Sequence, residues 1–372
     1  MDARAFHSTQ KRPFLGYPVN DHSSIDRANS YPASAVVGWS KGSLLLTPIT
    51  SYMNTGVRAS ISKGFPEREI ATTNEQSGTE QPGNQVVAVR FRDGERVFLK
   101  IATDGNHQRI TRDAAAIRYA GTHCDVRVPQ VLVADPTADP PYVATTLLHG
   151  TPVSAHWNLF ETDEREAILR QVGRGLAGIH TAQFGQSGHI VGGGADELDL
   201  DAGTWTDILC DDLERRTIEY LPDRFKDIFN QVCQSLHEHR SHLDNTSSVL
   251  LHGDPHPENC FFNSQIGFVD WETALVGDPT LDLCYVENQY IERPSVTTTD
   301  QLYRALRSGY CESVGGLPSD FELNRRIYRV VTFLLLQIAT FDYWAPQAED
   351  SAEELAGWVR EEITRRINCL YE

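Results

Sequence analysis

The sequence lacks paired cysteines, long apolar runs and an excess of basic residues. Its seven cysteines are scattered, and none of them form a Cys-x-x-Cys pair. We therefore expect neither a disulfide framework nor a zinc site, and we predict a reducing, cytoplasmic location. The most apolar run, Val330–Ala339, has ten residues and includes Gln337, which is too short to span a bilayer. No charged-then-apolar signal pattern opens the chain, so no membrane association is expected.

Acidic residues outnumber basic ones, 51 Asp and Glu against 33 Lys and Arg, for a net charge of −18. This balance argues against a nucleic-acid backbone as the main partner, because binding to phosphates requires clustered Lys and Arg. It suits a cationic ligand, although many soluble proteins are equally acidic without such a ligand. Hydrophobic residues make up 40% of the 372 residues, which is sufficient for two lobes with sizeable cores.

The most informative stretch is Leu250–Cys284, which places acidic and amide side chains after two apolar runs. Asp254 follows the first run, Asn259 comes five residues later, and Asp270 closes the second run, Ile266–Val269. Two short strands with a turn near residues 264–267 would bring Asn259 and Asp270 to one end, with Asp254 beside them. Hard oxygen ligands for Mg²⁺ and a carboxylate near an attacking hydroxyl are the groups that phosphoryl transfer needs.

This stretch resembles the catalytic core of the aminoglycoside phosphotransferase/choline kinase-like family, within the protein-kinase-like superfamily. The family pattern is H-G-D-x-x-x-x-N, then D-x-[DE], then G-D-P-x-x-D. Protein kinases carry an Arg between the His and the Asp, and Phe-Gly after the metal-binding Asp. Gly253 and Trp271-Glu272 stand at those positions here, which favours the small-molecule branch. The matching residues are His252, Gly253, Asp254, Asn259, Asp270, Glu272, Gly277, Asp278, Pro279 and Asp282.

The resemblance implies an α+β, protein-kinase-like fold with a small N-terminal β-rich lobe and a larger helical C-terminal lobe. Residues 1–65, rich in Ser, Pro, Gly and Asn, are predicted to be a poorly ordered extension. Residues 66–147 would form the nucleotide-binding lobe, with two strands joined at Asp93-Gly94. Residues 148–372 would form the helical lobe. Its helices are predicted from apolar spacing over 168–179, 205–220, 223–239, 302–314, 324–344 and 353–368.

The nucleotide side of the site is predicted around Lys100, which ends an apolar strand. In the family, the lysine of this strand contacts the phosphates of ATP, and its usual partner is a Glu on the next helix. Here the best match for that partner is Asp113, which could equally be a first-turn residue favoured by the helix dipole. The backbone of Thr145, Thr146 and Leu147 is predicted to be the hinge that holds adenine.

The catalytic side follows from the same resemblance. Asp254 is expected to orient the acceptor hydroxyl and accept its proton, and Asn259 and Asp270 are expected to bind Mg²⁺. His252 and Asp282 are assigned to structural support of the loop, with Asp282 accepting hydrogen bonds from loop N–H groups. Glu272, at the end of the predicted strand, either reaches the metal or a basic group or is solvated.

The predicted function is ATP- and Mg²⁺-dependent phosphorylation of a small-molecule hydroxyl. Ala195–Asp227 contains eleven Asp and Glu against four Lys and Arg, which would suit an aminoglycoside-like or other cationic acceptor if it faces the cleft. Choline, amino-acid, sugar and macrolide acceptors stay open, as does monomer against dimer. The alternatives are a non-catalytic nucleotide-binding regulatory protein, which the intact Lys100, Asp254 and Asp270 disfavour, and a protein kinase.

Overall fold

The structure, a computed structural model, describes residues 64–65, 70–75, 83–218, 220–292, 296, 299–348 and 350–371. Of the predicted extension over residues 1–65, only Gly64 and Phe65 fall within these ranges. Phe65 packs against Phe91, with 5.1 Å between the ring centres. The core of the small lobe therefore includes a residue that the sequence had assigned to the extension.

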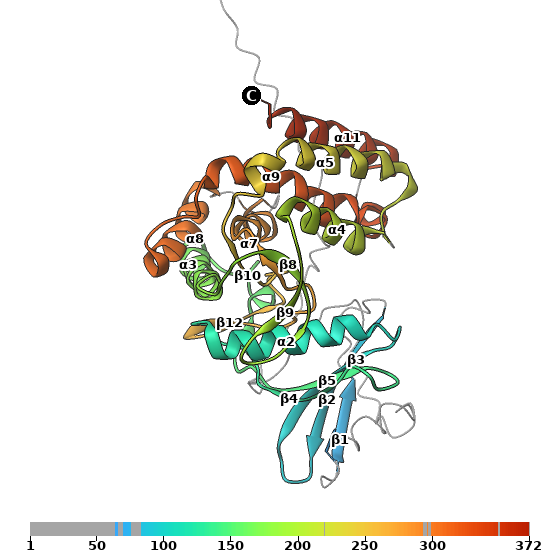
Figure 1. Cartoon of the computed structure of the whole chain (residues 1–372), viewed down its shortest axis with the longest axis vertical. Coiled ribbons are helices and arrows are strands. Elements are labelled where there is room, and N and C mark those ends of the chain that lie inside the picture. Colours follow the sequence, from blue (N-terminus) through green and yellow to red (C-terminus); the bar gives the residue numbers. More distant parts are fainter. Residues whose placement is uncertain are drawn as a thin grey trace, which may run out of the picture.

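The small lobe is a five-stranded antiparallel sheet with one helix across it (Figure 1). Alternate side chains of its second and third strands point into one core, because successive residues of a strand face opposite sides. The predicted Asp93-Gly94 hairpin turn is confirmed: Gly94 has a φ of 91° and donates to the Phe91 carbonyl at 3.0 Å. The elements, with strands in spatial order, are β1 (Ile70–Glu75), β2 (Asn84–Phe91), β3 (Arg96–Ala102), β5 (Tyr142–Thr146), β4 (Val131–Asp135) and α2 (His107–His123).

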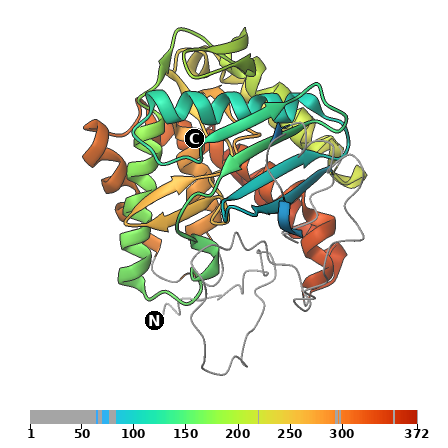
Figure 2. The ribbon, with the colours of Figure 1, turned by 90° about the horizontal axis from the view of Figure 1, so that it is seen from below.

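Helix α2 lies between the small-lobe sheet and the large lobe in both views (Figures 1 and 2). It contacts β3, β4 and β5 on one side and the β8–β9 hairpin of the large lobe on the other. Asn106 caps its first turn by accepting a hydrogen bond from the Arg109 backbone at 3.3 Å. Arg112 and Asp113 thus lie on the one helix that meets both lobes.

The large lobe is mainly helical, and the predicted helices are confirmed with small shifts at their ends. Its apolar side chains form two buried clusters, one beneath α4, α5, α9 and α11 and one around α3 and α8. None of the helices in the described ranges is long and apolar enough to cross a bilayer. The helices are α3 (Thr162–Ile179), α4 (Trp205–Thr217), α5 (Lys226–Glu238), α6 (Arg240–Leu243), α7 (Thr280–Val286), α8 (Thr299–Val314), α9 (Phe321–Phe333), α10 (Phe341–Trp344) and α11 (Ala352–Asn368).

The continuous helix predicted over residues 324–344 is wrong in detail, because the chain makes a π-helical turn there. This turn, η4 (Leu334–Ile338), follows α9, and the short helix α10 begins after Thr340. The Thr340 hydroxyl donates to the Leu336 carbonyl at 2.9 Å, a local bond that competes with regular helix geometry. A second π-helical turn, η3 (Glu287–Ile291), extends α7. The 3₁₀ turns are η1 (Val153–Ala155), η2 (Asp223–Phe225) and η5 (Ala345–Gln347).

Two small antiparallel sheets complete the large lobe, in the orders β7-β10-β13-β8-β9 and β12-β11-β6. The β8–β9 hairpin was missed from the sequence, although Leu198 and Leu200 alternate with Asp199 and Asp201, the period-two pattern of a strand. The stretch Ala195–Asp227 is therefore a strand followed by helices. The strands are β6 (Thr151–Pro152), β7 (Gln183–Phe184), β8 (Ser187–Gly193), β9 (Leu198–Gly203), β10 (Ser248–Leu251), β11 (Cys260–Asn263), β12 (Gln265–Phe268) and β13 (Leu275–Gly277).

Candidate active site

The candidate catalytic loop runs from the end of β10 to the start of β11, over residues 252–259. Gly253 has a φ of 80°, and a Cβ there would lie 2.3 Å from the Thr273 carbonyl oxygen. Only glycine suits this position, because it combines the left-handed region with a close backbone approach. This turn places the backbone just before Asp254 next to Thr273, in the segment that follows Asp270.

His252 is fully buried, and both of its ring nitrogens are used inside the loop. Its Nδ1 lies 3.3 Å from the Asp254 backbone N–H, and its Nε2 lies 3.0 Å from the Val269 carbonyl. These contacts assign the acceptor role to Nδ1 and the hydrogen to Nε2. The ring also packs on Trp271, with 4.7 Å between ring centres. His252 therefore ties the loop to the strand that leads into Asp270 and has no free nitrogen for proton transfer.

Asp282, in the first turn of α7, also holds this loop. Its two oxygens accept the backbone N–H groups of His252 at 2.8 Å and Gly253 at 3.0 Å. Burial favours the neutral carboxyl, but the hydrogen bond and charge of His180 and the His252 contacts outweigh it, so the pKa of Asp282 lies below its usual value. His180 Nε2 is 3.2 Å from Asp282, and His180 Nδ1 is 3.0 Å from the Tyr310 hydroxyl.

The hairpin β11–β12 brings Asn259 and Asp270 to one end, as the spacing predicted. The Val269 N–H donates to the Asn259 carbonyl at 3.0 Å, so the residue before β11 lies opposite the residue that precedes Asp270. The turn is tighter than expected, because Asn263 pairs with Gln265 around Ser264 alone. The Asn259 amide donates to the Asp254 carbonyl at 3.0 Å and to its carboxylate at 3.3 Å.

Lys100, on β3, reaches across the lobe junction to three carboxylates. Its Nζ lies 3.1 Å from Asp113 and 2.8 Å from Glu272, and it also contacts Asp270. Burial alone would lower the pKa of Lys100, but the charges of Asp113, Asp270 and Glu272 outweigh it and hold this pKa well above its usual value. The Asp113 side chain, which is shorter than the Glu usual at this position in the family, thus does reach Lys100.

Asp113 also fixes the backbone after Asp270, since its second oxygen accepts the Trp271 N–H at 2.9 Å. Asp270 itself has a φ of 65°, in the left-handed region that non-glycine residues seldom adopt. Glu272 is only 9% exposed and accepts a hydrogen bond from Asn84 at 2.7 Å, so it is a buried member of the cluster. Asn84 was not predicted as a site residue.

The other residues predicted for the nucleotide side are the hinge residues Thr145, Thr146 and Leu147. Thr145 and Thr146 lie in β5, where they pair with Phe98 and Val97 of β3, and Leu147 follows the strand. The predicted hinge therefore begins inside the sheet. The family resemblance also implies a glycine-containing turn over the phosphates, before the first strand of the Asp93-Gly94 hairpin, near Gly78 and Gly83. Gly83 is described, whereas Gly78 lies outside the described residues.

Arginines next to the loop form part of the site that sequence reasoning missed. Arg216, near the end of α4, donates to the Gly253 carbonyl at 3.0 Å and to the Tyr285 hydroxyl at 3.3 Å. Its guanidinium is 3.5 Å from Asp212. Arg112, on α2, donates to the Glu272 carbonyl at 2.9 Å. Apart from the Arg216–Asp212 pair within α4, these contacts join segments far apart in the chain, so no local sequence pattern predicts them.

The donor set next to the loop suits a hard cation. Asp270 and Asn259 supply a carboxylate and an amide from neighbouring hairpin ends, and oxygen donors of this kind are the ligands that Mg²⁺ takes. Within the described residues, no group of three or more His, Cys, Asp or Glu side chains is arranged as a metal site. A metal held by Asp270 and Asn259 would need further ligands besides these two side chains.

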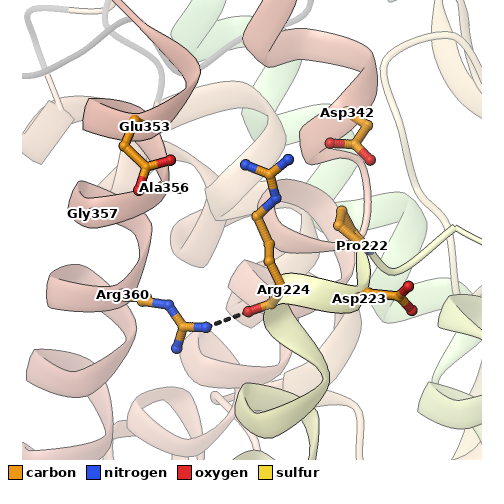
Figure 3. Close-up of a pocket in the computed structure, with 8 residues that line it drawn as sticks. All are labelled: Pro222, Asp223, Arg224, Asp342, Glu353, Ala356, Gly357 and Arg360. Carbon is orange, nitrogen blue, oxygen red and sulfur yellow. Dashed lines mark hydrogen bonds between the residues drawn. The ribbon is translucent and has the colours of Figure 1, made fainter.

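A separate pocket of about 650 Å³ lies in the large lobe, between η2, α10 and α11 (Figure 3). Arg360 on one wall donates to the Arg224 carbonyl and pairs with Asp227 at 2.7 Å. None of the candidate site residues line it, so it is not part of the catalytic loop. The lining residues are Pro222, Asp223, Arg224, Asp342, Glu353, Ala356, Gly357 and Arg360.

Comparison with known proteins identifies the family of the chain. Residues 81–317 match the model of the phosphotransferase enzyme family (APH). No curated protein sequence matches significantly.

Solved structures give the same fold at low identity. A thermostable mutant of aminoglycoside phosphotransferase APH(4)-Ia, in ternary complex with ADP and hygromycin B, aligns with a TM-score of 0.56 and 16% identity, over 84% of this chain and 98% of that one. A putative fructosamine-3-kinase from Thermobifida fusca aligns with 0.54 and 18%, over 82% and 97%. The streptomycin–ATP–APH(2")-IIa ternary complex aligns with 0.54 and 12%, over 84% and 96%.

Proposed function

Because the chain belongs to the phosphotransferase enzyme family, we propose that it transfers the γ-phosphate of ATP to a hydroxyl group of a small molecule. One observation carries the proposal. A buried lysine from the small lobe, Lys100, meets three carboxylates beside a rigidly held Asp254 loop of the large lobe. A merely structural ion pair needs one carboxylate for one lysine, and this site supplies an excess.

Asp254 is the residue proposed to orient the acceptor hydroxyl and take its proton. The surrounding contacts support this role, because His252, Asp282 and Arg216 fix the backbone at Gly253 and at the Asp254 N–H. A carboxylate held in one position lowers the barrier mainly by orienting the nucleophile. Asn259, which donates to the Asp254 carboxylate, restricts its rotation further.

Lys100 is proposed to contact the phosphates of ATP, with Asp113 holding it in place at 3.1 Å. The backbone of Thr145, Thr146 and Leu147 is proposed to receive the adenine base. Asp270 and Asn259 would hold Mg²⁺, which when bound offsets the negative charge of the phosphate oxygens. The excess of carboxylates around Lys100 supports a cation-binding role for Asp270.

The acceptor class is the open part of the proposal. The solved relatives in complex with hygromycin B or streptomycin raise the possibility of a polycationic acceptor. The acidic stretch Ala195–Asp227 supports that class less than its composition suggested, because several of its carboxylates are already paired with arginine or lysine side chains of the same chain. Asp207 contacts Arg240, Asp212 is 3.5 Å from Arg216, Asp223 is 2.6 Å from Lys226, and Asp227 is 2.7 Å from Arg360.

The test is the rate of ADP formation from ATP, with and without a panel of alcohols, for the wild type and Asp254→Asn. We expect kcat to fall by about 10²- to 10⁴-fold, the range for loss of a positioned base, while ATP affinity is retained. Activity should vanish with EDTA and return with Mg²⁺.

Asp163→Asn is the matched control, because Asp163 is an exposed carboxylate in the first turn of α3. It should behave like the wild type. An Asp254→Asn variant with most of its turnover would remove Asp254 from the mechanism, and nucleotide binding without any turnover would favour the non-catalytic regulatory role.

A further inference from the structure

The side of the catalytic loop that faces α4 and the β8–β9 hairpin carries three arginines, Arg112, Arg215 and Arg216, near the carboxylates of Asp211 and Asp212. Arg216 holds the loop through the Gly253 carbonyl and has Asp212 as its carboxylate partner. Two more arginines of this region, Arg112 and Arg215, form no ion pair with any carboxylate of the described residues. We call Arg112, Arg215 and His189 the basic face.

Arg112 joins the site to β8. Its Nη1 donates to the Glu272 carbonyl at 2.9 Å and its Nε donates to the Ile190 carbonyl at 3.3 Å. Burial lowers the pKa of Arg112, and the opposing charges of Asp212 and Glu272 do not restore it. The guanidinium is thus anchored by backbone carbonyls and lacks a direct counter-charge.

His189, on β8, is the second observation. It is 3% exposed, and its Nε2 is buried without a hydrogen-bond partner among the described residues. It pairs with Leu275 of β13, two residues after Thr273, which donates to the His252 carbonyl. A buried polar nitrogen without a partner costs free energy, which a bound ligand would recover.

The charges around His189 come from several elements. Burial lowers its pKa to about 4, and the charges of Arg215 and Arg112 act in the same direction, against Asp212 and Asp211. His189 is therefore neutral at pH 7 and offers a neutral N–H or a lone pair. Arg215 is exposed, and its Nε donates to the Asp211 carbonyl at 3.4 Å, which leaves its other donors open to a ligand.

We propose that the acceptor carries an anionic oxygen group, a carboxylate or a phosphate, in addition to its reacting hydroxyl, and that Arg112, Arg215 and His189 bind that group next to the Asp254 loop. The proposal rests on the proposed phosphotransferase function and specifies its substrate class. Guanidinium groups suit it because their planar fork matches the oxygens of both anions. Arg216 is a positioning residue for the loop and is already engaged.

Binding to the full-length protein loaded with AMP-PNP and Mg²⁺ tests the proposal by calorimetry. The probes are matched pairs: glycerate, glycerol 3-phosphate and glycerol, then gluconate and sorbitol, then glucose 6-phosphate and glucose. We expect at least one anionic probe to bind ten times more tightly than its neutral partner. The carboxylate and phosphate arms show which anion is preferred. Equal binding within every pair, or tighter binding of hygromycin B than of every anion, would overturn the proposal.

Variants tie that preference to named side chains. Arg215→Gln and His189→Gln should each weaken the preferred anion at least fivefold and leave its neutral partner unchanged. Arg112→Gln should do the same, and Arg112→Lys, which keeps the charge, guards against a folding defect from the lost backbone contacts. Arg326→Gln is the matched control, because Arg326 is exposed on α9, outside this face. Wild-type anion affinity in both Arg215→Gln and His189→Gln would refute the assignment.

Kinetics separate this inference from the proposed function. With the preferred anion as acceptor, Arg215→Gln should raise KM at least fivefold and keep kcat within twofold. If the enzyme phosphorylates neutral or cationic alcohols and Arg215→Gln does not change their KM, the anionic-acceptor inference is refuted and the proposed phosphotransferase function stands. Anion binding through these residues with no ATP consumption would instead sink the proposed function.

Discussion

The two faces of the catalytic loop pair their charges differently. On the face toward β3, Lys100 is one cation in contact with the carboxylates of Asp113, Asp270 and Glu272. On the face toward α4, Arg216 is paired with Asp212, whereas Arg112 and Arg215 form no ion pair with a carboxylate of the described residues. The first face thus has carboxylates in excess of the cation they contact, and the second has arginines without a paired carboxylate.

The difference matters because unbalanced charge is costly when it is shielded from water. A cluster with excess carboxylates is completed by cations, and a cluster of guanidinium groups is completed by anions. The overall charge of −18 would predict the first face and not the second. Local charge near the reacting atoms therefore says more about the ligand than the net charge does.

The largest effect is expected from Lys100→Met, which removes the cation and leaves three carboxylates together. Breaking a buried ion pair on one side costs about 3–5 kcal/mol of unfolding free energy. The pKa of Lys100 is raised, so in the wild type its stabilisation is fully present below its unfolded pKa and is lost only at strongly alkaline pH.

Urea unfolding at pH 8 measures this deficit. Lys226→Met is the control, since Lys226 is exposed and pairs with exposed Asp223, and it should change stability by no more than about 0.5 kcal/mol. A loss in Lys100→Met no larger than that of the control would mean that Lys100 does not offset the charge of the three carboxylates.

A smaller effect is expected on the basic face, from the depressed pKa of His189. Its pKa is about 4 in the folded chain, against about 6.5 in an unfolded one. Between these values only the unfolded chain binds the proton, so the wild type should lose stability as pH falls from about 6.5 toward 4. His189→Gln should show a shallower loss over this window, measured by urea unfolding at intervals of pH.

His189 also allows a test of whether an anion binds to the basic face. A saturating anionic probe should favour the protonated ring and reduce the loss of wild-type stability in acid. The neutral partner of that probe should have no such effect. Equal slopes for the wild type and His189→Gln would contradict the buried, unpartnered state of this ring.

Local spacing was enough to predict one face and not the other. The hairpin that joins Asn259 to Asp270 and the strand that carries Lys100 follow from short apolar runs in the sequence, although β3 continues past Lys100 to Ala102. The contact between Lys100 and Asp113, 13 residues apart, was inferred from the family resemblance, and Asp113 lies beyond the first turn of α2, so the alternative of a first-turn residue is wrong. His252 and Asp282 likewise make the contacts expected of residues that hold the loop.

The rest depends on contacts between distant segments. Asn84 and Glu272 are 188 residues apart, and Arg112 and Glu272 are 160 apart, so no sequence pattern connects them. The period-two alternation of the β8–β9 hairpin, which carries His189, is short and lies next to an acidic stretch. The residues of the basic face lie on three separate elements, α2, β8 and α4, so their proximity follows from the fold and not from a sequence pattern.

The smallest effect, and the sharpest separation of the two acceptor classes, is expected from Asp211→Asn. The Asp211 side chain is exposed and forms no ion pair within the described residues, while its carbonyl accepts from Arg215. Stability should change by no more than about 0.5 kcal/mol. Removing this charge should lower the KM of an anionic acceptor slightly, since one exposed charge is worth about 0.2–1 kcal/mol, and added salt should erase the gain. A cationic acceptor would show the opposite sign, a raised KM at low salt, with Asp163→Asn as the neutral control in both cases. The sign of this change in KM at low salt therefore shows which charge the acceptor presents to α4. A raised KM would contradict an anionic acceptor bound at the basic face and would favour a cationic acceptor bound by the acidic stretch Ala195–Asp227.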